Sequence, residues 1–159
     1  MKKIKIPHLW YFLFLGILIA METPTLKEID DFTVPEFLAE RVAILHDLPI
    51  DFATGLVREA KRMLYLSIIS NDSVAPSDRV DLAWHEMILF TRFYKEYADY
   101  IGGFIHHIPE RTEKNEKTET WKEIQKTLGK ERRGSDTYNK TKANYLKYFG
   151  IAPDPLYWP

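Results

Sequence analysis

Apolar residues recur every three or four positions in long stretches after residue 33, which is the spacing of one buried face of a helix. The first stretch covers 33–48, with Thr33 as a candidate N-cap and Pro35 in the first turn. Pro49 ends it, since proline cannot continue a helix. The positions expected to face inward are Val34, Phe37, Leu38, Arg41, Val42 and Leu45.

Two further helices are predicted from the same spacing. The second covers 51–70, and a loop rich in turn-forming residues separates it from a long third helix over 79–101. Glycine is typical just after the last turn of a helix, and a glycine pair stands there. The residues expected to cap or end these helices are Asp51, Ser77 or Asp78, Gly102 and Gly103.

The character of the chain changes after Pro109. Residues 110–135 are strongly charged, and we interpret them as a partly mobile insertion that carries a solvated helix over 118–130. A last helix over 137–149 is ended by Gly150. The irregular tail that follows is aromatic, and we expect Tyr157 or Trp158 to fill a groove on the helical core.

Together these patterns predict an all-α protein, a compact bundle of about four to five helices with an irregular aromatic C-terminal tail. Residues 22–159 would form this single domain, because no strand pattern and no internal repeat is found.

Residues 1–21 stand apart as a basic start followed by an uncharged apolar run. The run is shorter than the about 20 residues that a membrane-spanning helix needs. Three interpretations stay open: a signal peptide, a membrane anchor, or a segment upstream of a true start at Met21. The last predicts a cytoplasmic protein, and the others a membrane-anchored or exported one.

Composition narrows the classes of function. The chain has no cysteine, which excludes disulfides, thiolate nucleophiles and cysteine-ligated zinc. The formal net charge of -1 gives no overall attraction to nucleic acid. A local basic group, Lys130, Arg132 and Arg133, has acidic neighbours and is interpreted as solvated surface, with RNA contact through charge and stacking as the alternative. We therefore expect no nucleic-acid partner, and a membrane contact only through residues 1–21.

Histidines supply the candidate chemistry. Asp81 and His85 are four residues apart, so their side chains share one face of a helix, and His106 and His107 follow the glycine pair. We expect His85 to face the interior, with one of the two later rings beside it. The functional interpretation is a divalent metal such as zinc, iron or manganese held by Asp81, His85 and His106 or His107, with Glu86 as another candidate carboxylate.

A second interpretation has no metal. Asp81 and His85 would form a buried hydrogen-bonded pair, and the paired histidines would cap carbonyls at the end of the third helix. The protein would then be an interaction module that binds a protein partner through exposed aromatics and the tail. The sequence does not decide whether the protein is an enzyme. The stretch that begins at His85 starts like the H-E-x-x-H motif of zinc proteases, but Leu89 stands where that motif needs its second histidine.

Several short motifs carry a family resemblance. The blocks "PSDRVDLAWHEMILFTRFY", "GGFIHHIP" and "YFGIAPDPLYWP" resemble the glycine-rich domain-containing protein-like family. The resemblance implies no activity, and Met87 stands where many relatives have a second histidine. Besides the candidate ligands, the resemblance marks as structural motif residues Trp84, Thr91, Tyr94, Phe104 and Trp158.

Overall fold

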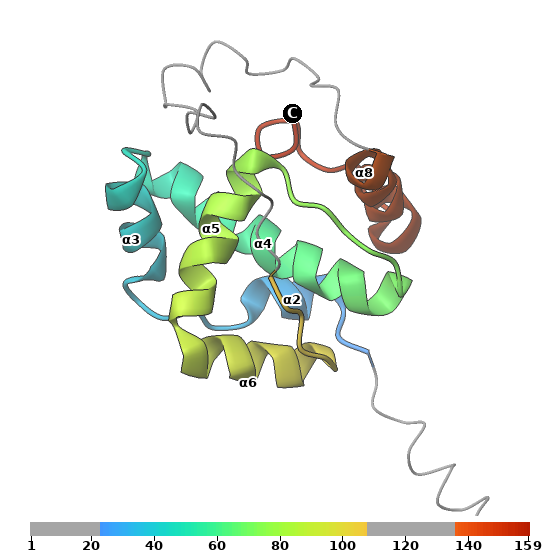
Figure 1. Cartoon of the computed structure of the whole chain (residues 1–159), viewed down its shortest axis with the longest axis horizontal. Helices are drawn as coiled ribbons and strands as arrows, with labels where there is room; N and C mark the ends of the chain where they lie inside the picture. The colour runs from blue at the N-terminus through green and yellow to red at the C-terminus, as the bar shows by residue number, and fades with distance from the viewer. Residues whose placement is uncertain (1–22, 108–135) are drawn as a thin grey trace, which may run out of the picture.

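The structure is a computed structural model that describes residues 23–107 and 136–159. Within these residues the chain forms six helices and no strand, so the predicted all-α class is confirmed (Figure 1). The helices are α2 (Leu26–Asp31), α3 (Leu38–Leu45), α4 (Ile50–Ser70), α5 (Asp78–Leu89), α6 (Thr91–Ile101) and α8 (Asp136–Phe149).

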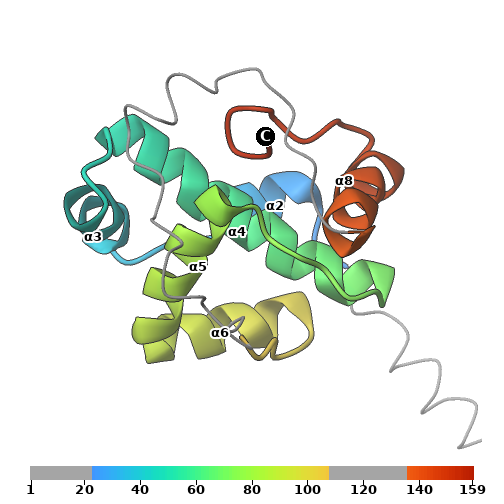
Figure 2. The ribbon, with the colours of Figure 1, turned by 45° about the horizontal axis from the view of Figure 1, so that its top comes forward.

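The long helix α4 lies in the middle of the molecule, and α2, α3, α5 and α8 all pack against it (Figures 1 and 2). Its side chains are buried on more than one face, which is expected of a helix surrounded by others. The fully buried apolar residues along it include Ala53, Leu56, Ala60, Met63 and Leu66.

Helix α2 was not predicted. Thr25 caps it, and the side chain of Glu28 accepts a hydrogen bond from the backbone of Thr25 in return, which completes a capping box. The helix has only six residues, too few for apolar spacing to reveal it, and it buries Ile29 completely.

Helix α3 begins later than predicted. Thr33 does not cap it, because the helix starts at Leu38 and Phe37 occupies the N-cap position without a side-chain bond. The segment before α3 is tied to α4 instead, because the buried ammonium group of Lys61 donates to the backbone carbonyls of Asp30 and Phe32. The expected inward face is also wrong in part, as Phe37 and Leu45 are exposed.

The predicted third helix is two helices. Of the two candidate caps Ser77 caps α5, its hydroxyl accepting from the backbone of Val80, and Gly102 ends α6 with a φ of 93°. The helix breaks between them at Phe90, whose ψ of 63° lies outside the helical region. The break turns α6 so that Phe93 packs towards Phe32, while α5 stays against α3 and α4.

The C-terminal part of the chain packs on α4 and completes the core. Helix α8 agrees with the predicted helix, and Gly150 follows it with a φ of 70°. Beyond it Tyr157 and Trp158 are buried, which confirms that the aromatic tail packs into the helical core.

One buried carboxylate fastens this tail. Glu59 of α4 accepts hydrogen bonds from the Tyr145 hydroxyl at 2.6 Å and from the Trp158 indole at 3.0 Å. Arg62 lies beside the same carboxylate at 2.9 Å and supplies a compensating charge.

Several predictions concern residues outside those described: the hydrophobic segment 1–21 and the partly mobile charged insertion 110–135, with its solvated helix over 118–130 and its basic group Lys130, Arg132 and Arg133. Among the helices that the structure describes, none combines the length and the apolar character needed to cross a membrane.

Candidate functional site

Three of the predicted site residues come together in one cluster. Asp81 lies between two imidazoles: its Oδ1 is 3.0 Å from Nε2 of His107, and its Oδ2 is 3.4 Å from Nδ1 of His85. The two rings are neighbours, with centroids 4.4 Å apart. We name Asp81, His85 and His107 the histidine–aspartate cluster, and one potential ligand atom from each lies within 4.8 Å of the others.

Local structure explains how two distant segments meet. The cap at Ser77 sets the start of α5, so Asp81 and His85 project from one face of that helix. Trp84 points inward, and its indole donates to the Tyr94 hydroxyl at 3.0 Å. That hydroxyl donates in turn to the backbone carbonyl of Ile105 at 2.6 Å, which holds the segment carrying His107 against α5.

The position of His107 is fixed by packing as well. Its ring meets the ring of Trp84 edge to face, with centroids 4.3 Å apart, and its side chain is only 11% exposed. His85 differs from the prediction, because 49% of its side chain is exposed and it faces solvent instead of the interior. The residues on either side of it, Trp84 and Glu86, take the buried directions. The cluster is therefore a shallow site, closed by Trp84 beneath and open above His85.

Two other candidate ligands lie elsewhere. His106 is exposed and rests against the ring of Phe104 at a centroid distance of 4.9 Å, outside the cluster. Glu86 is buried and pairs with Arg41 of α3. The helix-capping role expected of the paired histidines is not what His107 does, since its ring bonds Asp81 and not a carbonyl at the end of α6.

The remaining motif residues support the fold around the cluster. Thr91 begins α6 and is exposed, while Phe104 packs edge to face on Tyr94 with centroids 5.2 Å apart. Trp158 lies far along the chain and belongs to the buried tail.

The spacing of the donor atoms suits two kinds of chemistry. Ligands 2.0–2.2 Å from one ion lie about 2.8–3.1 Å from each other at adjacent octahedral positions and about 3.3–3.6 Å from each other in tetrahedral geometry. The 3.0 Å from Oδ1 of Asp81 to His107 fits the octahedral separation, and the 3.4 Å from Oδ2 of Asp81 to His85 fits the tetrahedral one. A hydrogen bond from the Nε2–H group of His107 to Asp81 gives the shorter distance equally well. The geometry therefore allows either a metal or a direct imidazole–carboxylate contact.

Sequence reasoning missed one histidine near this region. His46 follows the last turn of α3, and its Nε2 is buried without a hydrogen-bond partner among the described residues. Burial lowers the pKa of His46, and the nearby charge of Glu86 opposes that shift. No motif marks His46, because the proximity to Glu86 and His85 arises only when α3 packs on α5.

A family model matches residues 25–141, which is most of the chain and includes every residue of the cluster. The chain belongs to the UCP032817-like family. The resemblance to the glycine-rich domain-containing protein-like family is therefore wrong as an assignment. No curated protein matches the chain significantly, and no solved structure does.

The UCP032817-like match covers most of the described helices but assigns no chemistry to the cluster. It runs from the capping residue of α2 into the first half of α8 and leaves out the tail with Trp158. The family is uncharacterised, so the interpretation of the cluster depends on its own residues.

Proposed function

We propose that the histidine–aspartate cluster binds one divalent transition-metal ion, and that the protein is a helical metal-binding domain. The observation that carries the proposal is the convergence of Asp81, His85 and His107, whose potential ligand atoms lie within 4.8 Å of one another. Two of these residues come from one helix and the third from a segment that Trp84 and Tyr94 hold in place. Preorganised ligands of this kind lose little freedom on binding.

The donor set favours particular ions. Two imidazoles and one carboxylate suit zinc, iron(II) or manganese, and the chain has no cysteine to favour a softer ion. Because His85 is half exposed, water would complete the coordination on the solvent side. The imidazoles must be neutral to bind, so affinity falls in acid. The proposal includes no reaction.

Metal analysis of the purified full chain tests this proposal. We expect one equivalent of Zn²⁺, Mn²⁺ or anaerobic Fe²⁺ by elemental analysis and calorimetric titration. His85→Ala and Asp81→Asn each remove a ligand. Mutating a residue that only orients a metal ligand lowers metal affinity about 10–100-fold, so removing the ligand itself should lower it at least as much. His106→Ala is the matched control, because this neighbouring imidazole lies outside the cluster. Absence of metal uptake, or equal losses in the control, would reject the proposal.

A second candidate function keeps the cluster purely structural. The contact between His107 and Asp81 ties the segment after Gly103 to α5, and the Trp84–Tyr94–Ile105 hydrogen bonds do the same. The protein would then be an interaction module without a metal. Tyr157 and Trp158 cannot supply the partner surface in this case, because both are buried.

Stability measurements separate the two candidates. In a purely structural cluster, His107→Asn lowers the free energy of unfolding equally with and without added Zn²⁺. In a metal site, the difference between wild type and variant grows when Zn²⁺ is added, because only the folded wild type gains binding energy.

A further inference from the structure

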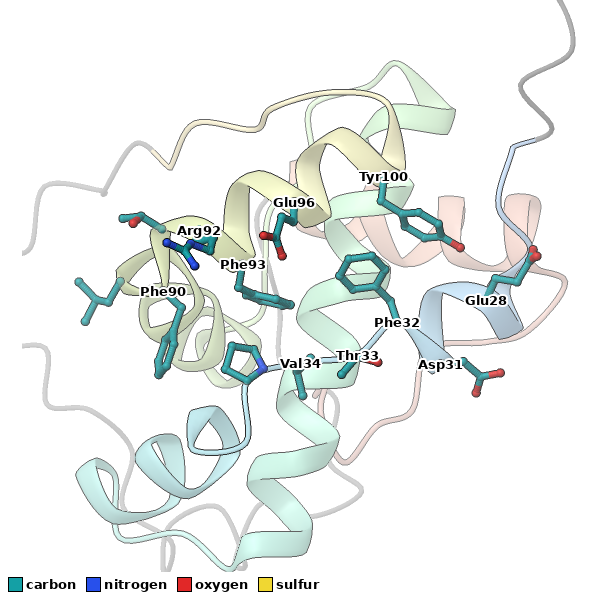
Figure 3. Close-up of a pocket in the computed structure, with 13 residues that line it drawn as sticks. Glu28, Asp31, Phe32, Thr33, Val34, Phe90, Arg92, Phe93, Glu96 and Tyr100 are labelled. Atoms are coloured by element: carbon teal, nitrogen blue, oxygen red, sulfur yellow. The ribbon is translucent and has the colours of Figure 1, made fainter.

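A groove crosses the surface beside α2 and α6, away from the histidine–aspartate cluster. It has a volume of about 890 Å³, and none of the cluster residues lines it (Figure 3). Ligand-binding clefts commonly have volumes of about 300–1,000 Å³. We call it the aromatic groove, and its lining is Glu28, Asp31, Phe32, Thr33, Val34, Pro35, Leu89, Phe90, Thr91, Arg92, Phe93, Glu96 and Tyr100.

The floor of the aromatic groove is made of rings. Phe32 stands between α2 and α6, with its centroid 4.7 Å from that of Tyr100 and 6.2 Å from that of Phe93 (Figure 3). Leu89 adds an apolar edge and is 61% exposed. Aromatic faces attract cations as well as apolar groups, so this floor accepts both aliphatic stems and positive charge.

The charges around the floor are mainly negative. The lining contains three carboxylates, those of Glu28, Asp31 and Glu96, and one guanidinium, that of Arg92. Hydrogen bonds from Thr25 lower the pKa of Glu28, so this carboxylate is ionised at neutral pH. Lys27 already pairs with Asp31. Glu96 makes no ion pair with another described residue and points towards the rings in Figure 3.

The shape indicates a long ligand. Most of the polar lining residues are exposed, so the groove is open along its length and encloses little. Small-molecule sites bury roughly 70–90% of their ligand, which an open groove does not provide. An extended segment can lie along such a surface and alternate its contacts between rings and carboxylates.

We propose that the aromatic groove docks a basic peptide segment of a protein partner, in which lysine or arginine alternates with apolar residues. The apolar residues pack on Phe32, Phe93 and Leu89. The cations meet Glu28 and Glu96 at the rim. This surface shares no residue with the proposed metal site, so the two proposals can fail separately.

Fluorescence anisotropy with the full chain tests the charge contribution. The probe is a fluorescein-labelled heptapeptide of alternating lysine and leucine, and the comparison peptide alternates glutamate and leucine. The basic peptide should bind more tightly, and Glu96→Lys should weaken it about fivefold at low salt, with less effect at high salt. Arg92→Glu should strengthen it. Glu40→Lys on α3 makes the same charge change outside the groove and should have little effect.

A second pair of variants tests the apolar contribution. Leu89→Ser should weaken the basic peptide at low and high salt alike, because it removes apolar contact and no charge. Leu146→Ser is its matched control, since Leu146 is exposed to a similar extent, 58%, but lies on α8. Circular dichroism of every variant verifies that the helical content is unchanged.

Several outcomes would overturn the proposal. They are failure to bind the basic peptide, equal binding of the acidic peptide, or equal losses in the test and control variants. Direct calorimetric binding of phenethylammonium, without any binding of the basic peptide, would make the groove a small-molecule site and would overturn it as well.

Discussion

Single residues in this fold are constrained by neighbours that lie far away in sequence, and Gly55 is the sharpest case. A Cβ atom at Gly55 would clash with the side chain of Tyr157. Alanine normally stabilises a helix interior by about 1 kcal/mol relative to glycine. Gly55→Ala should instead lower the free energy of unfolding by about 1–3 kcal/mol, because the core is overpacked.

Chemical denaturation of Gly55→Ala, Tyr157→Leu and the double variant measures this effect. The double variant should lose less than the sum of the single losses, because the smaller side chain makes room for the new methyl group. Strict additivity would show that the two residues do not compete for the same space.

His46 predicts a pH dependence of stability. Its pKa is lowered from 6.5 by burial, so the unfolded chain takes up a proton at a higher pH than the folded chain does. Stability contributed by the neutral ring is therefore complete above pH 6.5 and declines as the pH falls towards the lowered value. His46→Gln should lose less stability than wild type between pH 7.5 and 5.5. His106→Gln, which changes an exposed ring, is the control, and an identical pH slope in wild type and His46→Gln would contradict the prediction.

At the scale of elements, the sequence predicted the helix ends that are set by local capping interactions. Ser77 and Gly102 were identified because capping depends on residue type near the helix end. The start of α3 and the break at Phe90 were missed, since they depend on Lys61 and on the packing of α6 against Phe32. Such contacts are not visible in a window of sequence.

The candidate site follows the same division. The pairing of Asp81 with His85 follows from their spacing on a helix. The choice of His107 over His106 required the irregular segment after Gly103, where alternation alone does not decide direction. The prediction that His85 faces the interior was wrong, because Trp84 occupies the inward direction.

The docking of α8 gives a prediction at this scale. Burial raises the pKa of Tyr145, which keeps its hydroxyl protonated to donate to Glu59. Tyr145→Phe should cost about 1.5–3 kcal/mol, the range for a bond to a charged group. Tyr148→Phe on the same helix is partly exposed and should stay within about 0.5 kcal/mol. Equal costs in urea denaturation would mean that the bond to Glu59 contributes little.

For the whole molecule, a bound metal should appear as added stability. A ligand at 100 times its dissociation constant adds about 2.7 kcal/mol to the free energy of unfolding when only the folded state binds it. Zn²⁺ should therefore raise the melting temperature of wild type and His106→Ala but not of Asp81→Asn. The increase should shrink in acid, because protons compete with a metal ion for imidazole ligands. A rise of the same size in Asp81→Asn would place the ion elsewhere.

The buried carboxylate of Glu59 also bears on where the folding unit ends. The UCP032817-like match stops at Thr141, before both residues that donate to this carboxylate, Tyr145 and Trp158. A fragment cut at the limits of the match would expose the apolar side of α4 and leave its acid short of donors. Such a fragment should therefore unfold at a lower urea concentration than a chain that keeps residues 142–159.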